Sequence, residues 1–209
     1  MSPKLVLYSD QSSPLTDALD ARLLELLPAS RRKIGYIPAA PDRERLWFRQ
    51  RVLHYDRLGL SAQFFGLEEG FDAAELSNLL RSDAIHLSGG NTFRFLYWLR
   101  ARGLVSELQR YVADGGVLIG VSAGAILMTR DIGSSAICGD APYPALTDNT
   151  GLGLVDFAVL PHFDRSEAQH AALEQLATNL GNTAYGVPDG AGIVVSGSRV
   201  ELLGAIAQR

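Results

Sequence analysis

The sequence predicts an α/β fold in which a mostly parallel sheet is covered by helices on both faces. Three observations favour this class. Short apolar runs alternate with segments whose apolar residues recur at helical spacing, as in successive strand and helix units. Near the C-terminus, two apolar runs flank the turn Ser196-Gly197-Ser198, which predicts an antiparallel hairpin at the sheet edge. The length of 209 residues, with 47% hydrophobic and 20% charged residues, is typical of one compact domain spanning residues 1–209.

The first half of the chain is expected to supply four strands, each followed by a helix. The strands are expected at Lys4–Tyr8, 34–38, 61–67 and 83–88. The helices are expected at 14–27, 43–58, Ala73–Leu80 and 93–99.

Two of these helices have apolar residues that are expected to face the sheet. In the first helix they form one stripe of leucines: Leu15, Leu19, Leu23, Leu26 and Leu27. In the helix over 43–58 the expected inward residues are Leu46, Trp47, Val52 and Leu53. The arginines of that helix are expected to point to solvent.

In the second half, a helix at Leu104–Ala113 leads into the apolar strand 116–119 and a helix over 125–128. The segment 129–153 is rich in glycine, contains two prolines and shows no periodicity, so we expect a long loop that carries function. A strand is expected at 154–160. The helix after it begins with a capping box of Ser166 and Gln169 and stops at Gly181. The hairpin strands are expected at 192–195 and 200–203.

The most informative stretch is Gly120-Val121-Ser122-Ala123-Gly124, which joins an apolar strand to a helix. Gly-x-Ser-x-Gly in this position is typical of a nucleophile elbow, a sharp turn that presents the serine hydroxyl. The flanking residues must be small because the strained serine backbone brings strand and helix close together. The pattern predicts Ser122 as a nucleophile and the Ala123 amide as an oxyanion donor. The alternative is an ordinary strand-to-helix turn.

Other polar residues also follow expected strands, at the edge of the sheet where α/β proteins bind ligands. Gly89-Gly90-Asn91-Thr92 follows the strand 83–88 and fits either a tight turn with a helix cap or a second set of oxyanion amides. His162 follows the strand 154–160 and is the candidate general base. Two carboxylates could orient this histidine: Asp140 in the long loop and Asp189 near the C-terminus.

Composition excludes several classes of protein. A net charge of −4, with no basic cluster beyond the short run 31–33, disfavours a nucleic-acid-binding protein. No apolar run approaches the ~20 residues that span a membrane, and no apolar leader with a cleavage site is present. The single cysteine, Cys138, fits a reducing compartment, so a cytoplasmic protein is expected.

The remaining histidines are not expected to take part in chemistry. His54 and His86 lie inside expected elements and are interpreted as structural, and His170 is expected on a solvated helix face. No pair of histidines or cysteines has metal-ligand spacing, so no metal is predicted.

Three separated stretches resemble one family. They are Gly89-Gly90-Asn91-Thr92-Phe93, Gly120-Val121-Ser122-Ala123-Gly124-Ala125 and Pro161-His162-Phe163. In this order and spacing they resemble the dipeptidase E and cyanophycinase family of serine peptidases, and the similarity extends over nearly the whole chain. The resemblance implies a three-layer α/β/α fold like that of class I glutamine amidotransferases, with a serine where those enzymes carry a cysteine.

The resemblance also implies roles for particular residues. Ser122 would be the nucleophile and His162 the base, with oxyanion amides from Gly90, Asn91 and Ala123. The family's third member is acidic and lies in a Pro-Glu-Gly segment, which reads Pro188-Asp189-Gly190 here. Aspartate is one methylene shorter than glutamate. The family also has an aspartate in an Asp-x-Pro context, matched by Asp140-Ala141-Pro142, so Asp189 is favoured and Asp140 is the alternative. No cofactor is implied.

For the substrate, the resemblance implies small peptides, most of all dipeptides with an N-terminal aspartate. Such a preference needs a fixed cation, for which Arg165 in the loop after His162 is the candidate, with Tyr143 as a further substrate contact. A cyanophycinase-like amide or ester hydrolase of different specificity is one alternative, and a non-catalytic binding module on the same fold is another. Association into a homodimer is left open.

Overall fold

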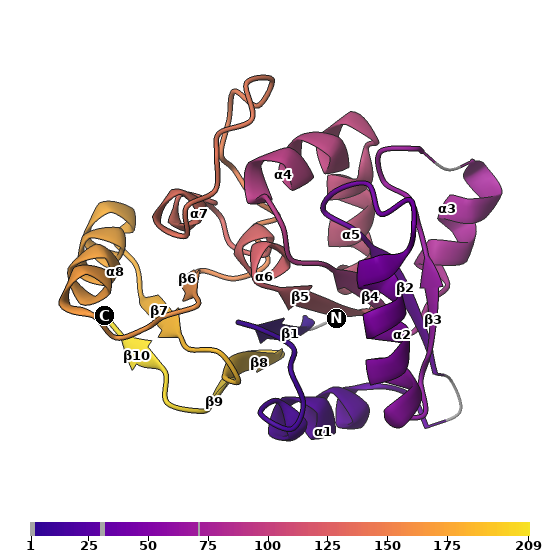
Figure 1. Ribbon diagram of the computed structural model, residues 1–209, viewed down its shortest axis with the longest axis horizontal. Helices are drawn as coiled ribbons and strands as arrows, with labels where there is room; N and C mark the ends of the chain where they lie inside the picture. Colours follow the sequence, from indigo (N-terminus) through magenta and orange to yellow (C-terminus); the bar gives the residue numbers. More distant parts are fainter. Residues whose placement is uncertain (1–2, 30–31, 71) are drawn as a thin grey trace.

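The computed structural model describes residues 3–29, 32–70 and 72–209 (Figure 1). Met1 and Ser2, at the start of the segment in which we expected no leader, lie outside the described residues, and so does Arg31 of the short basic run. Within that run Arg32 is exposed and Lys33 is the first residue of β2.

The central sheet contains seven strands in the order β3-β2-β4-β5-β1-β8-β9. Their bounds are Lys4–Tyr8 (β1), Lys33–Ile37 (β2), Ser61–Phe64 (β3), Ala84–Leu87 (β4), Val117–Val121 (β5), Gly192–Ser196 (β8) and Arg199–Leu203 (β9). Strands β1 to β5 pair in parallel, whereas β8 runs antiparallel to β1 and β9 antiparallel to β8. The mostly parallel sheet and the hairpin at its edge are therefore confirmed.

Helices cover both faces of this sheet, which confirms the three-layer arrangement. One face carries α1 (Asp17–Leu26) and α2 (Leu46–Arg57). The other carries α3 (Ala73–Leu80), α4 (Thr92–Ala101), α5 (Leu104–Ala113) and α6 (Ala123–Leu127). Because successive side chains of a strand point to opposite faces, Val6 and Tyr8 of β1 pack with α1, and Leu5 and Leu7 pack on the other side. No helix among the described residues is long and apolar enough to cross a membrane.

The sequence pattern does not predict the second sheet, which has the strand order β10-β7-β6. Its strands are Ala158–Pro161 (β6), Ala184–Val187 (β7) and Ala207–Gln208 (β10), and α8 (Glu167–Leu180) packs on it (Figure 1). The expected strand 154–160 is thus shorter and lies outside the central sheet. Leu154 and Val155 do not belong to a strand and pack against the main core instead. The backbone N–H of Leu154 donates to the Met128 carbonyl.

The expected inward faces of two helices are partly wrong. Leu46, Trp47 and Leu53 of α2 are 55%, 66% and 67% exposed. Leu15 is 66% exposed because it precedes α1, which begins only at Asp17. The long loop also contains a short helix, α7 (Ser134–Ile137).

The buried face of α2 carries His54 and Tyr55 instead of leucines. Both side chains have buried polar partners: His54 Nε2 lies 3.3 Å from Asp20 Oδ1, and the Tyr55 hydroxyl lies 2.6 Å from His86 Nδ1. Buried polar groups are stable when they are hydrogen-bonded in this way. Hydrophobic periodicity therefore predicts the wrong inward face for this helix. The interpretation of His54 and His86 as structural residues agrees with these contacts.

Candidate active site

Ser122 lies in the sharp turn between β5 and α6, with φ of 50° and ψ of −108°. A positive φ at a non-glycine residue is strained, so the surrounding chain must hold it. The Ser122 amide donates to the Tyr8 carbonyl at 3.0 Å. A Cβ on Gly120 would collide with the Gly124 backbone, and one on Gly124 with the Leu87 carbonyl. Both glycines are thus needed for β5, α6 and β4 to meet around the serine.

His162 and Asp189 come from the second sheet. His162 follows β6, and Asp189 lies just beyond β7, its parallel neighbour. The register pairs the last residues of the two strands, so the chain segments that follow emerge at the same edge. His162 Nδ1 lies 2.7 Å from Asp189 Oδ1, and His162 Nε2 lies 2.8 Å from Ser122 Oγ. Three segments distant in sequence therefore form one chain of hydrogen bonds.

Asp140 lies elsewhere. Its Oδ2 accepts the backbone N–H of Thr92 at 2.8 Å, at the start of α4. The Asn91 side chain adds a bond from Nδ2 to the Ala141 carbonyl at 2.7 Å. These bonds fasten the long loop to the N-terminus of α4, where a carboxylate is favoured by the helix dipole. Of the two carboxylates that the sequence left open, the structure brings Asp189 to His162.

The turn after β4 passes next to Ser122. A Cβ built on Gly89 would lie 3.7 Å from Ser122 Cβ, an ordinary contact. Gly90 has φ of 144°, and a Cβ there would lie only 2.7 Å from Ala39 Cβ. Glycine is therefore required at position 90 by both conformation and space.

The backbone amides expected to bind an oxyanion are not used by the fold. Asn91 caps α4, because its Oδ1 accepts the Arg94 amide at 2.8 Å, so the helix-cap interpretation holds for its side chain. No described residue accepts a hydrogen bond from the backbone N–H of Gly90, Asn91 or Ala123. The helix-cap interpretation and the oxyanion interpretation are therefore compatible, and the role of the three amides as oxyanion donors stays a prediction.

Ser9 is a site residue that sequence reasoning missed. It directly follows β1 and is fully buried. Its Oγ accepts the backbone N–H of His162 at 2.8 Å and donates to Asp189 Oδ1 at 3.0 Å. Ser9 thus ties the central sheet to the histidine and aspartate of the second sheet. The sequence signal that could have identified Ser9 is its position directly after an apolar strand, where site residues of α/β proteins lie.

The two candidate substrate contacts have other partners in the structure. The Arg165 guanidinium donates to the Ala205 carbonyl at 2.6 Å. The Tyr143 ring packs against Tyr97, with ring centroids 4.9 Å apart. Neither side chain bonds to Ser122 or His162, and a role in substrate binding stays a prediction for both.

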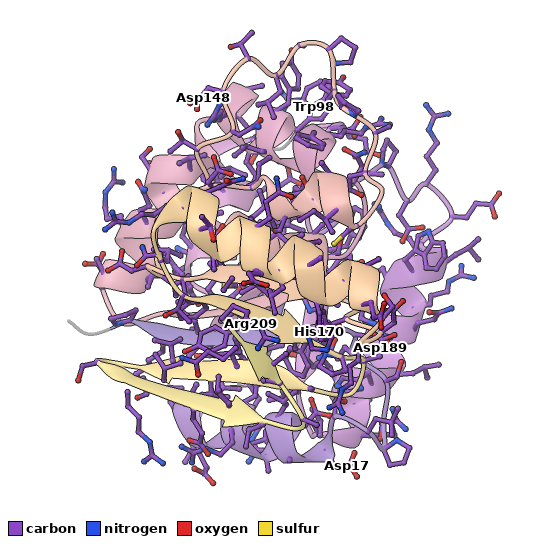
Figure 2. All side chains as sticks on the ribbon, turned by 90° about the vertical axis from the view of Figure 1, so that its left-hand side faces the viewer. Asp17, Trp98, Asp148, His170, Asp189 and Arg209 are labelled. Atoms are coloured by element: carbon purple, nitrogen blue, oxygen red, sulfur yellow. The ribbon has the colours of Figure 1, made fainter. Side chains whose placement is uncertain are left out.

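His170 is not fully solvated as expected. Its ring is half-buried and edge-on to Phe163, with centroids 5.0 Å apart, and Nδ1 lies 3.3 Å from an Arg209 guanidinium nitrogen (Figure 2). In the part of the chain that the structure describes, no group of three or more histidine, cysteine, aspartate or glutamate residues could hold a metal ion.

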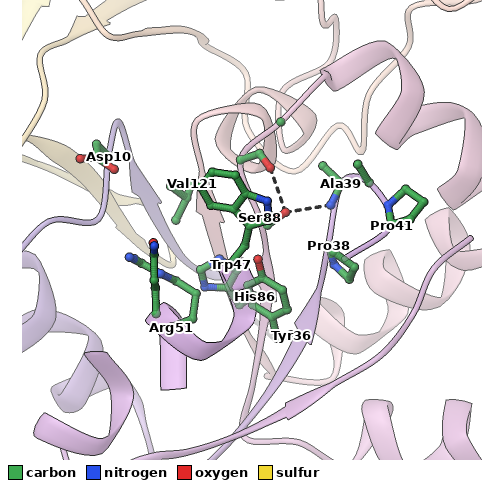
Figure 3. Close-up of a pocket in the computed structure, with 14 residues that line it drawn as sticks. Asp10, Tyr36, Pro38, Ala39, Pro41, Trp47, Arg51, His86, Ser88 and Val121 are labelled. Atoms are coloured by element: carbon green, nitrogen blue, oxygen red, sulfur yellow. Dashed lines mark hydrogen bonds between the residues drawn. The ribbon is translucent and has the colours of Figure 1, made fainter. Parts of the chain in front are cut away.

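A cavity of about 440 Å³ opens beside the turn that carries Ser122. Its walls come from the ends of β2, β4 and β5, from α2 and from the loop after β1. Ser88 joins two of these walls, since its Oγ accepts the Ala39 amide at 2.8 Å and donates to the Gly89 carbonyl at 3.0 Å (Figure 3). The volume is within the usual range for small-molecule sites, roughly 300–1,000 Å³.

Two charged side chains line this cavity, Asp10 and Arg51, together with the imidazole of His86. Burial, and then the electrostatic interactions with Arg51 and His54, hold the pKa of His86 well below its usual value. Burial raises the pKa of Tyr55, so its hydroxyl stays protonated, and it lies in hydrogen-bond contact with His86 Nδ1 at 2.6 Å. His86 is therefore neutral at neutral pH, and Arg51 is the cation of the cavity.

We expect Ser9→Ala to lower the free energy of unfolding by about 1–3 kcal/mol, because the substitution leaves the His162 N–H without an acceptor and removes one of the hydrogen bonds to Asp189 Oδ1. Urea denaturation followed by circular dichroism measures this difference. The exposed Ser12, which donates to Asp10, is the matched control, and Ser12→Ala should change stability by about 0.5 kcal/mol or less. Equal effects of the two substitutions would contradict the bridging role of Ser9.

Comparison with known proteins agrees with this architecture. The sequence profile of peptidase family S51 matches residues 5–203. An uncharacterised peptidase from Pasteurella multocida is 31% identical over 158 residues, 70% of this chain and 72% of that protein. Peptidase E from Nostoc sp. PCC 7120 is 27% identical over 221 aligned positions, covering 98% and 87% of the two chains. The crystal structure of a protein assigned to Peptidase E from Listeria monocytogenes EGD-e has a TM-score of 0.77 at 23% identity, covering 97% of this chain and 98% of that one. The chain therefore belongs to peptidase family S51.

Proposed function

We propose that the protein is a serine peptidase that hydrolyses small peptides, most of all dipeptides with an N-terminal aspartate, through an acyl-enzyme on Ser122. The observation that carries this proposal is the hydrogen-bonded chain from Ser122 Oγ through His162 to Asp189, with distances of 2.8 Å and 2.7 Å. A base in reach of a hydroxyl, itself oriented by a carboxylate, is the arrangement that activates a serine. Membership of a peptidase family supports peptides as the substrates.

In the first half of the reaction, Ser122 Oγ attacks the carbonyl carbon of the scissile amide while His162 Nε2 accepts the hydroxyl proton. The carbonyl oxygen takes up the negative charge, and the unused amides of Gly90, Asn91 and Ala123 are suited to stabilise it. When this tetrahedral species collapses, the carbon–nitrogen bond breaks and His162 gives its proton to the leaving amine. An ester between the N-terminal amino acid and Ser122 results.

In the second half, a water molecule attacks the ester. His162 Nε2 takes a proton from the water as its oxygen bonds to the carbonyl carbon. Collapse of the second tetrahedral species breaks the bond to Ser122 Oγ, which recovers its proton from His162. One water is consumed for each peptide bond, and no step requires a cofactor.

Asp189 keeps the imidazole in the productive tautomer. When its carboxylate accepts a hydrogen bond from the Nδ1–H of His162, the unprotonated Nε2 faces Ser122, and the imidazolium formed on proton transfer is stabilised. Ser9 donates to the same carboxylate oxygen and fixes its position. The distance of 2.7 Å supports the assignment of Asp189 although aspartate is one methylene shorter than the family's glutamate.

A fluorophosphonate probe tests this function. We expect the probe to label the wild-type protein at Ser122 and to leave Ser122→Ala unlabelled, because only an activated serine displaces the leaving group of the probe. Labelling is measured by mass spectrometry of tryptic peptides. No labelling of the wild type would favour a non-catalytic binding module. Labelling without preference for Asp-x dipeptides over other dipeptides and esters would keep a serine hydrolase and reject the aspartyl specificity.

The roles of the two carboxylates are separated by matched substitutions. We expect Asp189→Asn to lower kcat for an Asp-x dipeptide by roughly 10³–10⁴-fold, because the amide favours the wrong histidine tautomer. Asp140→Asn should change kcat by about two-fold or less, since its amide oxygen can still accept the Thr92 N–H. Steady-state kinetics of both variants measure the difference. A larger loss for Asp140→Asn would reverse the assignment.

A further inference from the structure

The cavity beside Ser122 presents a cation and a carboxylate to a bound molecule. Building on the proposed function, we propose that this cavity binds the N-terminal residue of the peptide, with Arg51 binding its acidic side chain and Asp10 its α-ammonium group. Substrate recognition is thereby assigned to α2 and to the loop after β1, and not to Arg165.

The strand order indicates which half of the substrate enters the cavity. Ser122 follows β5, with β4 and β2 on one side of that strand and β1 and β8 on the other. His162 is held through Ser9 at the end of β1. Of the cavity lining, Asp10 follows β1, whereas a larger part follows β4 and β2, such as Gly89 and Pro38. The leaving amine must lie near His162 because it receives the proton of the imidazole. The acyl half, which is the N-terminal residue, then extends into the cavity.

The positive charge of Arg51 has no carboxylate partner among the described residues. Its side chain is half-buried, and Nη1 donates to the Gln11 carbonyl at 2.8 Å and to Gln11 Oε1 at 3.0 Å. Both acceptors are neutral, and within the described part of the chain Arg51 forms no ion pair. A guanidinium has five N–H donors, so the donors on Nε and Nη2 are left for a ligand. Their fork matches the two oxygens of a carboxylate.

Gln11 also positions the carboxylate of Asp10. The backbone N–H of Gln11 donates to Asp10 Oδ1 at 2.7 Å, and the Ser12 hydroxyl donates to Asp10 Oδ2 at 2.5 Å. A carboxylate accepts about four hydrogen bonds, so capacity for an ammonium group is left. Gln11 is itself buried, which fixes the two opposite charges relative to each other. An N-terminal aspartate carries its ammonium and its carboxylate on adjacent carbons and complements such a pair.

The rest of the cavity is largely apolar. Figure 3 shows Asp10 and Arg51 on one side, Pro38 and Pro41 on the other, and Trp47 between them. Trp47 is 66% exposed, which is uncommon for a tryptophan. In this proposal its indole ring forms an apolar wall against which the substrate packs. The sequence-based expectation of Trp47 as a core residue is wrong, because its side chain is exposed and lines this cavity.

The test compares Asp-Leu with Asn-Leu, which differ only in the charge and hydrogen bonding of one side chain. We expect the ratio of their kcat/KM values to fall by ~10- to 100-fold in Arg51→Met, because charge-assisted hydrogen bonds to the substrate are lost. Arg51→Lys should retain part of the preference. Arg49→Met, on the exposed face of the same helix, is the matched control and should leave the ratio unchanged. The ratio does not depend on the folded fraction, so reduced stability cannot imitate the effect.

The Asp10 assignment has its own readout. Asp10→Asn should raise KM for Asp-Leu about ten-fold without changing the preference over Asn-Leu, because both dipeptides carry the same ammonium group. An unchanged KM would remove Asp10 from the proposal.

The outcomes separate this inference from the proposed function. Wild-type protein that labels with fluorophosphonate and prefers Asp-Leu, with an unchanged ratio in Arg51→Met, would overturn the role of Arg51 alone. Loss of the preference in Arg165→Met but not in Arg51→Met would return recognition to Arg165. Absence of both labelling and hydrolysis in the wild type would overturn the proposed function and this inference together.

Discussion

The left-handed backbone of Ser122 is the constraint on which the site depends. A serine at φ of 50° is of the order of 1–3 kcal/mol less stable than one in a relaxed conformation, so the strain must be balanced by packing around it. That packing is the contact of β5 with its parallel neighbours β4 and β1, and of α6 with the end of β4. Gly120 and Gly124 allow these backbones to meet without a side chain between them. The apolar core on both faces of the sheet therefore fixes the position of one hydroxyl.

The second half of the site depends on a joint between two sheets. His162 and Asp189 follow strands of a small sheet that has an apolar cluster under α8, and His162 contacts Ser122 at the carboxyl end of the central sheet. Ser9 is the residue that crosses this joint by hydrogen bonds to both. If the small sheet shifted by an ångström, the bond between Ser122 and His162 would lengthen, and proton transfer in such a site is sensitive to that distance. The position of the second sheet and the chemistry are thus coupled through the Ser9 hydroxyl, in addition to the packing of Val159 and Val187 against the main core.

Much of this arrangement is predictable from the sequence because its signals are local. Glycines around Ser122, the hairpin turn and the alternation of apolar runs each reflect a backbone or packing requirement of nearby residues. The second sheet is not predictable in this way, because β6 and β7 are only four residues long and are recognised by pairing with each other. The inward face of α2 was missed because polar pairs, such as Tyr55 with His86, replace leucines there. The choice between Asp189 and Asp140 required the distance to His162, which no local pattern contains.

The central claim is that Ser122 forms a covalent acyl intermediate with the N-terminal half of the substrate. Rapid acid quenching of the full-length protein during turnover of aspartyl p-nitroanilide, followed by mass spectrometry, tests it most directly. The account predicts an added mass of one aspartyl group on the tryptic peptide 111–130, at Ser122, and no such adduct in Ser122→Ala. An acyl group on a different residue, or undiminished turnover by Ser122→Ala, would contradict it.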